Sequence, residues 1–128
     1  MHKVILSVAP VSNATTNLDP KAIAEDVIAS YHAGASMVHL HSRDRNGLLV
    51  ADTALLADTV ALIRAQCPIV IEISTGGVSS LTIEQRCQTC LPDWVECNSL
   101  NVGSVNLGEA VYQNPIREVR YCVEQILQ

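Results

Sequence analysis

The chain lacks an excess of basic residues, a long hydrophobic run and the pattern of a secretory leader, and each absence narrows the classes of protein to consider. Eight Lys and Arg stand against 13 Asp and Glu, for a net charge of −5, so we expect no nucleic-acid partner. The longest apolar stretches are only strand-sized, so we expect no membrane span. The first residues show no long apolar segment with a small-residue cleavage site, which favours a cytoplasmic protein.

Cysteine is too scarce for a scaffold held together by disulfides. The chain has 5 cysteines, an odd number, spread over 128 residues. Cys87 and Cys90 form a C-x-x-C pattern, which can serve redox chemistry or half of a zinc site. The pattern lies late in a helical segment and no second C-x-x-C accompanies it. We therefore interpret these cysteines as small apolar side chains that pack in the interior.

The chain does contain ample apolar material, arranged in a repeating pattern. Hydrophobic residues make up 48% of the chain and charged residues 16%, which is enough for a core. Four short runs rich in Val and Ile are predicted strands, namely 3–9, 36–41, 69–74 and 94–99. These runs are apolar on both faces, as parallel strands are when helices cover their sheet.

A segment with helix signals follows each predicted strand. The residues typical of helix starts are Asp19-Pro20, Asp52, Thr82 with Gln85 in a capping box, and Asn114-Pro115. The chain is therefore an α/β protein made of four βα units, with no linker between them. A TIM barrel spreads roughly 250 residues over eight such units. We accordingly predict that residues 1–128 form a single domain, the N-terminal half of a TIM barrel, as a fragment or a truncated chain.

A small open doubly wound sheet is the alternative fold, because four parallel strands can form one as well. The order of strands and helices does not separate the two folds. Polar residues follow several of the predicted strands, and barrel active sites are built at the C-terminal ends of the strands. The placement of polar residues therefore favours the barrel.

His39 and His41 close the second predicted strand. Side chains at positions i and i+2 of a strand point to the same face, so the two imidazoles should lie side by side. Such a pair at a strand end suits two ligands of one metal ion. The alternative is a hydrogen-bonded pair of histidines without a metal.

Polar groups also follow the third and fourth predicted strands. Segment 74–77 contains a glycine pair whose backbone N–H groups could hold an anion, although glycine pairs more often mark simple turns. Ser99 and Asn101 could both donate hydrogen bonds inward or could cap the strand end. We expect these groups to lie at the same end of the sheet as the histidines. We expect Glu72, inside the third strand, to be a buried or helix-facing carboxylate with a partner and no catalytic role.

Three segments, in order and at matching separations, resemble the signature of the β-keto acid cleavage enzymes. Segments 38–47 (VHLHSRDRNG), 73–77 (ISTGG) and 100–108 (LNVGSVNLG) are similar to the family patterns H-L-H-x-R-D-x-x-G, I-S-T-G-G and L-N-x-G-[ST]-x-N-x-G. The type member of this family is the 3-keto-5-aminohexanoate cleavage enzyme. The resemblance covers the whole chain but only the first half of the family's length.

The resemblance implies a TIM-barrel enzyme with one Zn²⁺, which condenses a β-keto acid with acetyl-CoA and releases acetoacetate and a new acyl-CoA. His39 and His41 would be zinc ligands. The residues that would bind the keto acid are Ser74, Thr75, Gly76, Gly77, Ser99 and Asn101. The third zinc ligand and the catalytic residues would come from later strands, so we expect this chain alone to be inactive. Ala14 stands where founding members carry a glutamate, which puts recognition of the far end of the substrate in doubt.

Two other functional classes stay open. One is a different metal-dependent TIM-barrel enzyme, such as an amidohydrolase, although there the H-x-H closes the first strand. The other is a non-catalytic half-barrel module. An open half-barrel exposes its inner face and two sheet edges, so we expect a homo-oligomer or other self-association. Val4, Leu6, Val38 and Val70 should be less buried than is usual for their type wherever they face that interior.

Overall fold

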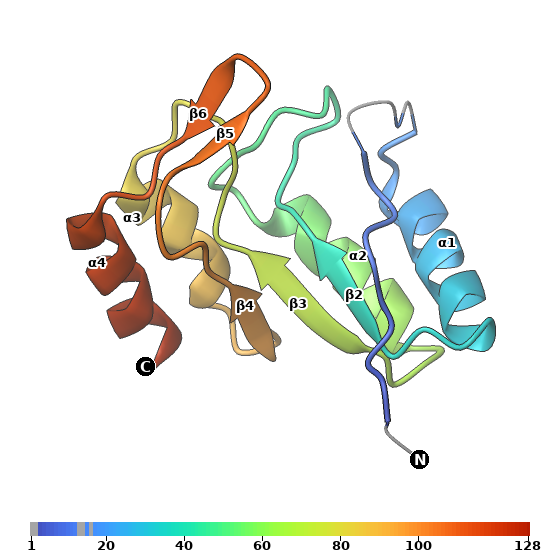
Figure 1. Ribbon diagram of the computed structural model, residues 1–128. Helices are drawn as coiled ribbons and strands as arrows, with labels where there is room; N and C mark the ends of the chain where they lie inside the picture. Colours follow the sequence, from blue (N-terminus) through green and yellow to red (C-terminus); the bar gives the residue numbers. More distant parts are fainter. Residues whose placement is uncertain (1–2, 13–14, 16) are drawn as a thin grey trace.

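A computed structural model describes residues 3–12, 15 and 17–128, and its centre is a four-stranded parallel sheet (Figure 1). The strands are β1 (Ser7–Val8), β2 (Met37–Leu40), β3 (Val70–Ser74) and β4 (Cys97–Ser99), and they lie in the order β1-β2-β3-β4. Each strand is parallel to its neighbours. The order in space therefore follows the order in the chain, and the predicted parallel α/β architecture of successive βα units is confirmed.

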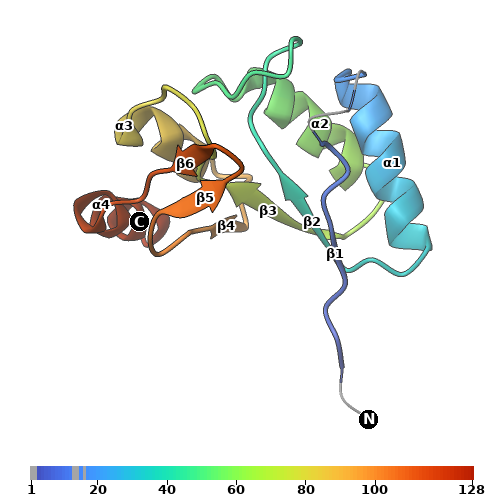
Figure 2. The same ribbon diagram turned by 45° about the horizontal axis from the view of Figure 1, so that its top comes forward.

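Helices follow the strands of the sheet along the chain. They are α1 (Pro20–His32), α2 (Ala54–Arg64), the short α3 (Ile83–Arg86) with the 3₁₀ turn η1 (Cys87–Cys90), and α4 (Ile116–Ile126). Helices α1 and α2 pack against each other beside β2, while α3 and α4 lie at the β4 end of the sheet (Figures 1 and 2). None of the described helices is long and apolar enough to cross a bilayer.

One face of the sheet carries the hydrophobic core. In the parallel register Val38 lies beside Ile71 and Leu40 beside Ile73, and all four side chains are 3% exposed or less. They pack against apolar side chains of α1 and α2, which include Val27, Leu56, Val60 and Ile63. Helices therefore cover this face, and side chains of alternate residues point to the other one.

The opposite face is largely uncovered. Val70 is 39% exposed on this face, as we expected of an open half-barrel. Val4 (84% exposed) and Leu6 (53% exposed) precede β1 at alternate positions from Val8, which lies beside Val38, so their exposure does not report on this face. Val38 does not face this side, because it alternates onto the helix-covered face, where it is fully buried. A doubly wound sheet has helices on both faces, so the uncovered face disfavours that alternative. Self-association through this face stays a prediction.

The helix starts follow the local signals closely. Asp19 is the N-cap of α1, and Thr82 with Gln85 forms the expected capping box of α3. The N-cap of α2 is Thr53 and not Asp52, but the Asp52 carboxylate still accepts a hydrogen bond from the first backbone N–H of that helix. The strands are shorter than predicted, most of all β1, which is an edge strand bonded to β2 alone among the described residues.

A β-hairpin that the sequence did not predict follows β4. Strands β5 (Val105–Leu107) and β6 (Ala110–Tyr112) pair antiparallel across a turn that contains Gly108, whose φ is +62°. Each strand has only three residues, too few for alternation to be recognised. The hairpin extends past the C-terminal end of the sheet (Figure 1). It thereby adds a wall at the end where the polar residues lie.

Candidate functional site

The two histidines of β2 face each other at the C-terminal end of the strand. The Nε2 atoms of His39 and His41 are 3.1 Å apart, and the two rings are inclined by 78°. The prediction that i, i+2 spacing places both rings at one point is therefore confirmed. The pair lies on the uncovered side of the sheet, away from the core residues Val38 and Leu40.

Glu72 completes this cluster from the neighbouring strand. The parallel register places it directly beside His39, and its Oε2 lies 2.7 Å from Nδ1 of His39. The expected partner is thus confirmed, but the expected helix-facing position is wrong, because cross-strand neighbours share a face. A carboxylate only accepts hydrogen bonds, so Nδ1 of His39 carries the proton and Nε2 presents its lone pair.

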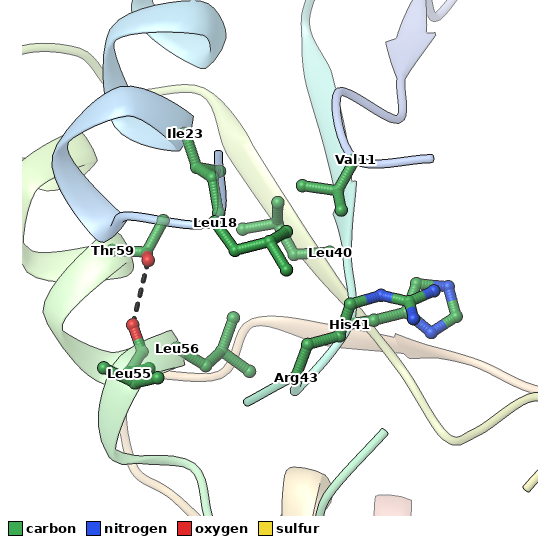
Figure 3. Close-up of a pocket in the computed structure, with 9 residues that line it drawn as sticks. All are labelled: Val11, Leu18, Ile23, Leu40, His41, Arg43, Leu55, Leu56 and Thr59. Carbon is green, nitrogen blue, oxygen red and sulfur yellow. Dashed lines mark hydrogen bonds between the residues drawn. The ribbon is translucent and has the colours of Figure 1, made fainter. Parts of the chain in front are cut away.

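His41 is held neutral by its surroundings. Burial, then the charges of His39 and Arg43, lower the pKa of His41 from 6.5 to about 4. His41 and Arg43 also border a cavity of about 30 Å³ between β2 and the helices, with Leu55 and Thr59 on its other side (Figure 3). That volume holds about one water molecule, so this cavity has no room for a substrate.

We expect the metal-free protein to lose stability as the pH falls from about 6.5 to about 4. The unfolded chain protonates His41 near its ordinary pKa of 6.5, whereas the folded chain does so only near about 4. Protons therefore favour the unfolded state, by up to about 2 kcal/mol once the partial exposure of the ring is allowed for. Urea unfolding at a series of pH values, with a chelator present, measures this effect.

His41→Gln is the control for this prediction, because glutamine keeps a polar side chain and does not titrate. The variant should show a flatter dependence of unfolding free energy on pH across the same window. An equal slope in both proteins would contradict the assignment to His41.

The turn after β3 is built around Ser74 and Gly76. The hydroxyl of Ser74 donates to the carbonyl of Gly76 at 2.8 Å and accepts from the N–H of Gly76 at 3.2 Å. Gly76 has φ of +146°, and a Cβ on this residue would lie 2.5 Å from Nε of Arg86. Only glycine therefore fits between the turn and the guanidinium below it.

Gly76→Ala should lower the free energy of unfolding by roughly 2–4 kcal/mol, because backbone strain and a steric clash act together. Gly103→Ala is the matched control: Gly103 has φ of +137°, but nothing lies within 4 Å of its added Cβ. The difference between the two variants isolates the clash. If chemical unfolding gave equal losses of unfolding free energy for the two variants, the Arg86 side chain would move aside without cost.

Arg86 is a functional-site neighbour that the sequence analysis missed. Its side chain is 5% exposed, although the residue carries a charge. The guanidinium donates to Thr75 O at 2.9 Å, Gln113 O at 3.1 Å, Tyr112 OH at 3.0 Å and Asn114 Oδ1 at 2.7 Å, and it lies 3.5 Å from Glu118 Oε2. Arg86 thus ties the turn after β3 to the end of the hairpin and the start of α4. A lone arginine in a short helix gives no sequence signal of this role.

Some of the binding residues predicted from the sequence line cavities beside His41, and the others do not. Ser74 and Gly76 line a small cavity together with His41, and Gly77 lines an open cavity of about 510 Å³ that also reaches His41. Leu107 and Ala110 of the hairpin form another wall of this larger cavity. It is large enough for a small organic substrate.

The remaining predicted binding residues are placed differently. The Thr75 side chain is buried and donates to the carbonyl of Ser99 at 2.8 Å, so it fastens β3 to β4. Ser99 lies beside Ser74 in the sheet register, whereas Asn101 is exposed beyond β4. Ala14, at the position of the family glutamate, lies outside the described residues.

The histidine pair has the donor geometry of half a metal site. Two nitrogens bound to one tetrahedral Zn²⁺ at roughly 2.0–2.1 Å lie about 3.3 Å apart, close to the 3.1 Å between the two Nε2 atoms. Nδ1 of His41 is buried and has no hydrogen-bond partner among the described atoms. In the part of the chain that the structure describes, no group of three or more His, Cys, Asp or Glu is arranged to hold a metal ion. Any metal here would need further ligands.

Comparison with known proteins places this arrangement in a family. The model of the beta-keto acid cleavage enzyme family matches residues 3–128. A 3,5-dioxohexanoate:acetyl-CoA acetone transferase of Paraburkholderia graminis is 31% identical over 128 residues, covering 94% of this chain and 41% of that protein. A 3-oxoadipate:acetyl-CoA acetyltransferase of Cupriavidus necator is 33% identical over 120 residues, covering 87% of this chain and 41% of that protein.

A third relative carries the name of the family's type member. The 3-keto-5-aminohexanoate cleavage enzyme of Fusobacterium nucleatum is 36% identical over 88 residues, covering 67% of this chain and 32% of that protein. The chain thus spans about two fifths of the length of the first of these relatives. A family match over residues 3–128 shows that the chain belongs to the beta-keto acid cleavage enzyme family.

Proposed function

We propose that the protein containing this chain is a zinc-dependent β-keto acid cleavage enzyme, which condenses a β-keto acid with acetyl-CoA and releases acetoacetate and a new acyl-CoA. The observation that carries the proposal is the pair of facing Nε2 atoms at the end of β2, beside an open cavity. Relatives named for acetyl-CoA transfer support the reaction class.

His39 and His41 would hold the metal through Nε2. Glu72 would keep the proton of His39 on Nδ1, so that the lone pair of Nε2 stays directed at the site. The lowered pKa of His41 keeps its imidazole neutral, which a metal ligand requires. Zn²⁺, when bound, would act as a Lewis acid that polarises the keto group and stabilises the enolate released by C–C cleavage.

The turn after β3 would bind the carboxylate of the keto acid. Ser74 and Gly76 line the same small cavity as His41, and Gly77 lines the larger one. A keto acid that spans both places would therefore have its carboxylate at the turn after β3 and its keto oxygen at the histidine pair. Ser99 lies next to Ser74 in the sheet and would extend this surface.

We infer that the four βα units are the first half of a TIM barrel. The strand order follows the chain order, helices cover one face, and the inner face is uncovered. The polar residues gather at the C-terminal ends of the strands, where barrel enzymes carry their active sites. The rest of the barrel would supply the third metal ligand and the residues that move protons.

The test is an assay of the protein at the full length of its relatives. Purified protein, with zinc, is incubated with acetyl-CoA and a panel of β-keto acids that differ in their side group. The proposal predicts acetoacetate and the matching acyl-CoA, detected by mass spectrometry, for at least one member of the panel. Hydrolysis of substrates without acetyl-CoA, or no turnover of any β-keto acid, would overturn it.

Glu72→Ala should weaken zinc binding by roughly 10–100-fold, because removal of the carboxylate frees the tautomer and ring of His39. Competition with a chromophoric chelator measures the affinity without any assay of turnover. Glu124→Ala, on the exposed side of α4, is the control and should bind zinc as the unmodified protein does. Unchanged affinity in Glu72→Ala would show that the carboxylate does not position the ligand.

A further inference from the structure

The C-x-x-C segment meets a third cysteine that is distant in sequence. Cys87, in η1, has its Sγ 3.2 Å from Sγ of Cys122 in α4, and the two residues are separated by 35 positions. Both side chains are 1% exposed. Cys90, the last residue of η1, is near enough to Cys87 for each thiol to shift the pKa of the other, so the three thiols form one cluster at η1 and α4.

We propose that Cys87 and Cys122 form a reversible intramolecular disulfide, and that Cys90 is the thiol that first reacts with a small-molecule disulfide. The two sulfur atoms are already in van der Waals contact, so bond formation needs only a small approach of α4 toward η1. Nothing in the proposed acetyl-CoA chemistry uses these thiols.

Access to the cluster is through Cys90. This residue is half-buried, and it lines a cavity of about 370 Å³ together with Pro92, Cys97 and Gln125. This cavity gives one sulfur of a small disulfide, such as oxidised glutathione, a route to the Cys90 thiol. Cys87 and Cys122 are buried and do not line this cavity, which explains why a relay is needed.

Cys90 and Cys122 are more acidic than Cys87, which suits the order of steps in the relay. Interaction with the Cys87 thiol lowers the pKa of Cys90, and it lowers the pKa of Cys122 to about 7. The hydrogen bond to Cys122 raises the pKa of Cys87. Cys90 and Cys122 therefore attack as thiolates in the first and last steps of the relay, whereas Cys87 attacks only once its proton has been removed.

The exchange balances in three steps. The Cys90 thiolate attacks one sulfur of the small disulfide, and one small thiolate leaves. Cys87, whose proton passes to that thiolate, attacks the Cys90 sulfur and displaces the second small thiolate. The Cys122 thiolate then attacks the Cys87 sulfur, and Cys90 leaves as a thiolate. Two protein thiols are oxidised, and one small disulfide is reduced to two thiols.

The bond would fasten α4 to η1 beside the Arg86 junction. Arg86 directly precedes Cys87, and its guanidinium bonds Asn114 just before α4. Closing a loop between residues 35 positions apart restricts the unfolded chain. Oxidation should therefore raise the melting temperature by roughly 5–15 °C.

The experiment equilibrates the purified protein with mixtures of oxidised and reduced glutathione, with a chelator present to exclude metal-catalysed oxidation. Free thiols are then alkylated, and the disulfide is mapped by mass spectrometry of non-reduced peptides. We expect a Cys87–Cys122 cross-link, a higher melting temperature, and reversal of both by a phosphine reductant. A protein in which Cys87 and Cys122 stay fully alkylated, or in which Cys87 pairs only with Cys90, would overturn the proposal.

Variants separate the roles. Cys122→Ser should lose the gain in melting temperature, and Cys90→Ser should slow formation of the cross-link at least about tenfold without changing its position. Cys97→Ser removes the other cysteine that lines the cavity beside Cys90. It should leave the gain in melting temperature and the rate of cross-linking unchanged. Unchanged kinetics in Cys90→Ser would refute the relay, and the peptide map of the unmodified protein decides the main claim even if a variant fails to fold.

Discussion

Replacing Arg86 with methionine should lower the free energy of unfolding by about 3–5 kcal/mol, a large part of the stability of a small domain. Methionine fills a similar volume but donates no hydrogen bonds. The change leaves the carbonyls of Thr75 and Gln113 and the side chain of Asn114 without their donor, in a place where the arginine is 5% exposed. Urea unfolding, followed by circular dichroism, measures the loss.

Arg117→Met is the control for Arg86→Met. Arg117 is the second residue of α4, close to the Arg86 junction, but its side chain is 84% exposed. Its replacement should change the unfolding free energy by less than about 0.5 kcal/mol. A loss below about 1 kcal/mol in Arg86→Met would show that water replaces the lost hydrogen bonds. The junction between the turn, the hairpin and α4 would then be held by packing alone.

Removing either imidazole should abolish tight zinc binding. His39→Ala and His41→Ala each delete one of two facing Nε2 donors, so we expect the affinity to fall by more than about 100-fold, beyond the effect of a supporting residue such as Glu72. Acetoacetate formation by the full-length protein should be lost with it. Zinc titration against a competing chelator measures the affinity directly.

His32→Ala is the matched control, because His32 is exposed at the end of α1, before β2 begins, whereas the facing pair lies at the C-terminal end of β2. Its zinc affinity and turnover should equal those of the unmodified protein. If His39→Ala kept its affinity while His32→Ala lost it, the metal would bind elsewhere and the account of the site would be wrong.

Local chemistry made part of this protein predictable. The i, i+2 spacing of His39 and His41 was enough to place both rings at one point, because strand alternation is a property of the backbone. Thr82 and Gln85 formed the expected capping box for a similar reason, since both partners lie within one helical turn. Parallel βα units followed from the regular alternation of short apolar runs with helix signals.

Long-range contacts were not predictable in the same way. Glu72 lies beside His39 only because β2 and β3 pair in one particular register, which no local pattern encodes. Arg86 meets partners up to 32 positions away, and Cys87 meets a thiol 35 positions away. The hairpin was missed because strands of three residues carry too little alternation. In each case the decisive interaction joins elements that are distant in sequence.

The most direct test of the central claim is anomalous diffraction at the zinc edge from crystals of the full-length protein grown with zinc. If the histidine pair holds the metal, one strong zinc peak lies at roughly 2.0–2.1 Å from Nε2 of both His39 and His41, with Glu72 still bonded to Nδ1 of His39. Zinc bound at the Cys87, Cys90 and Cys122 cluster instead, or a histidine pair that keeps its direct Nε2 contact in saturating zinc, would contradict the claim.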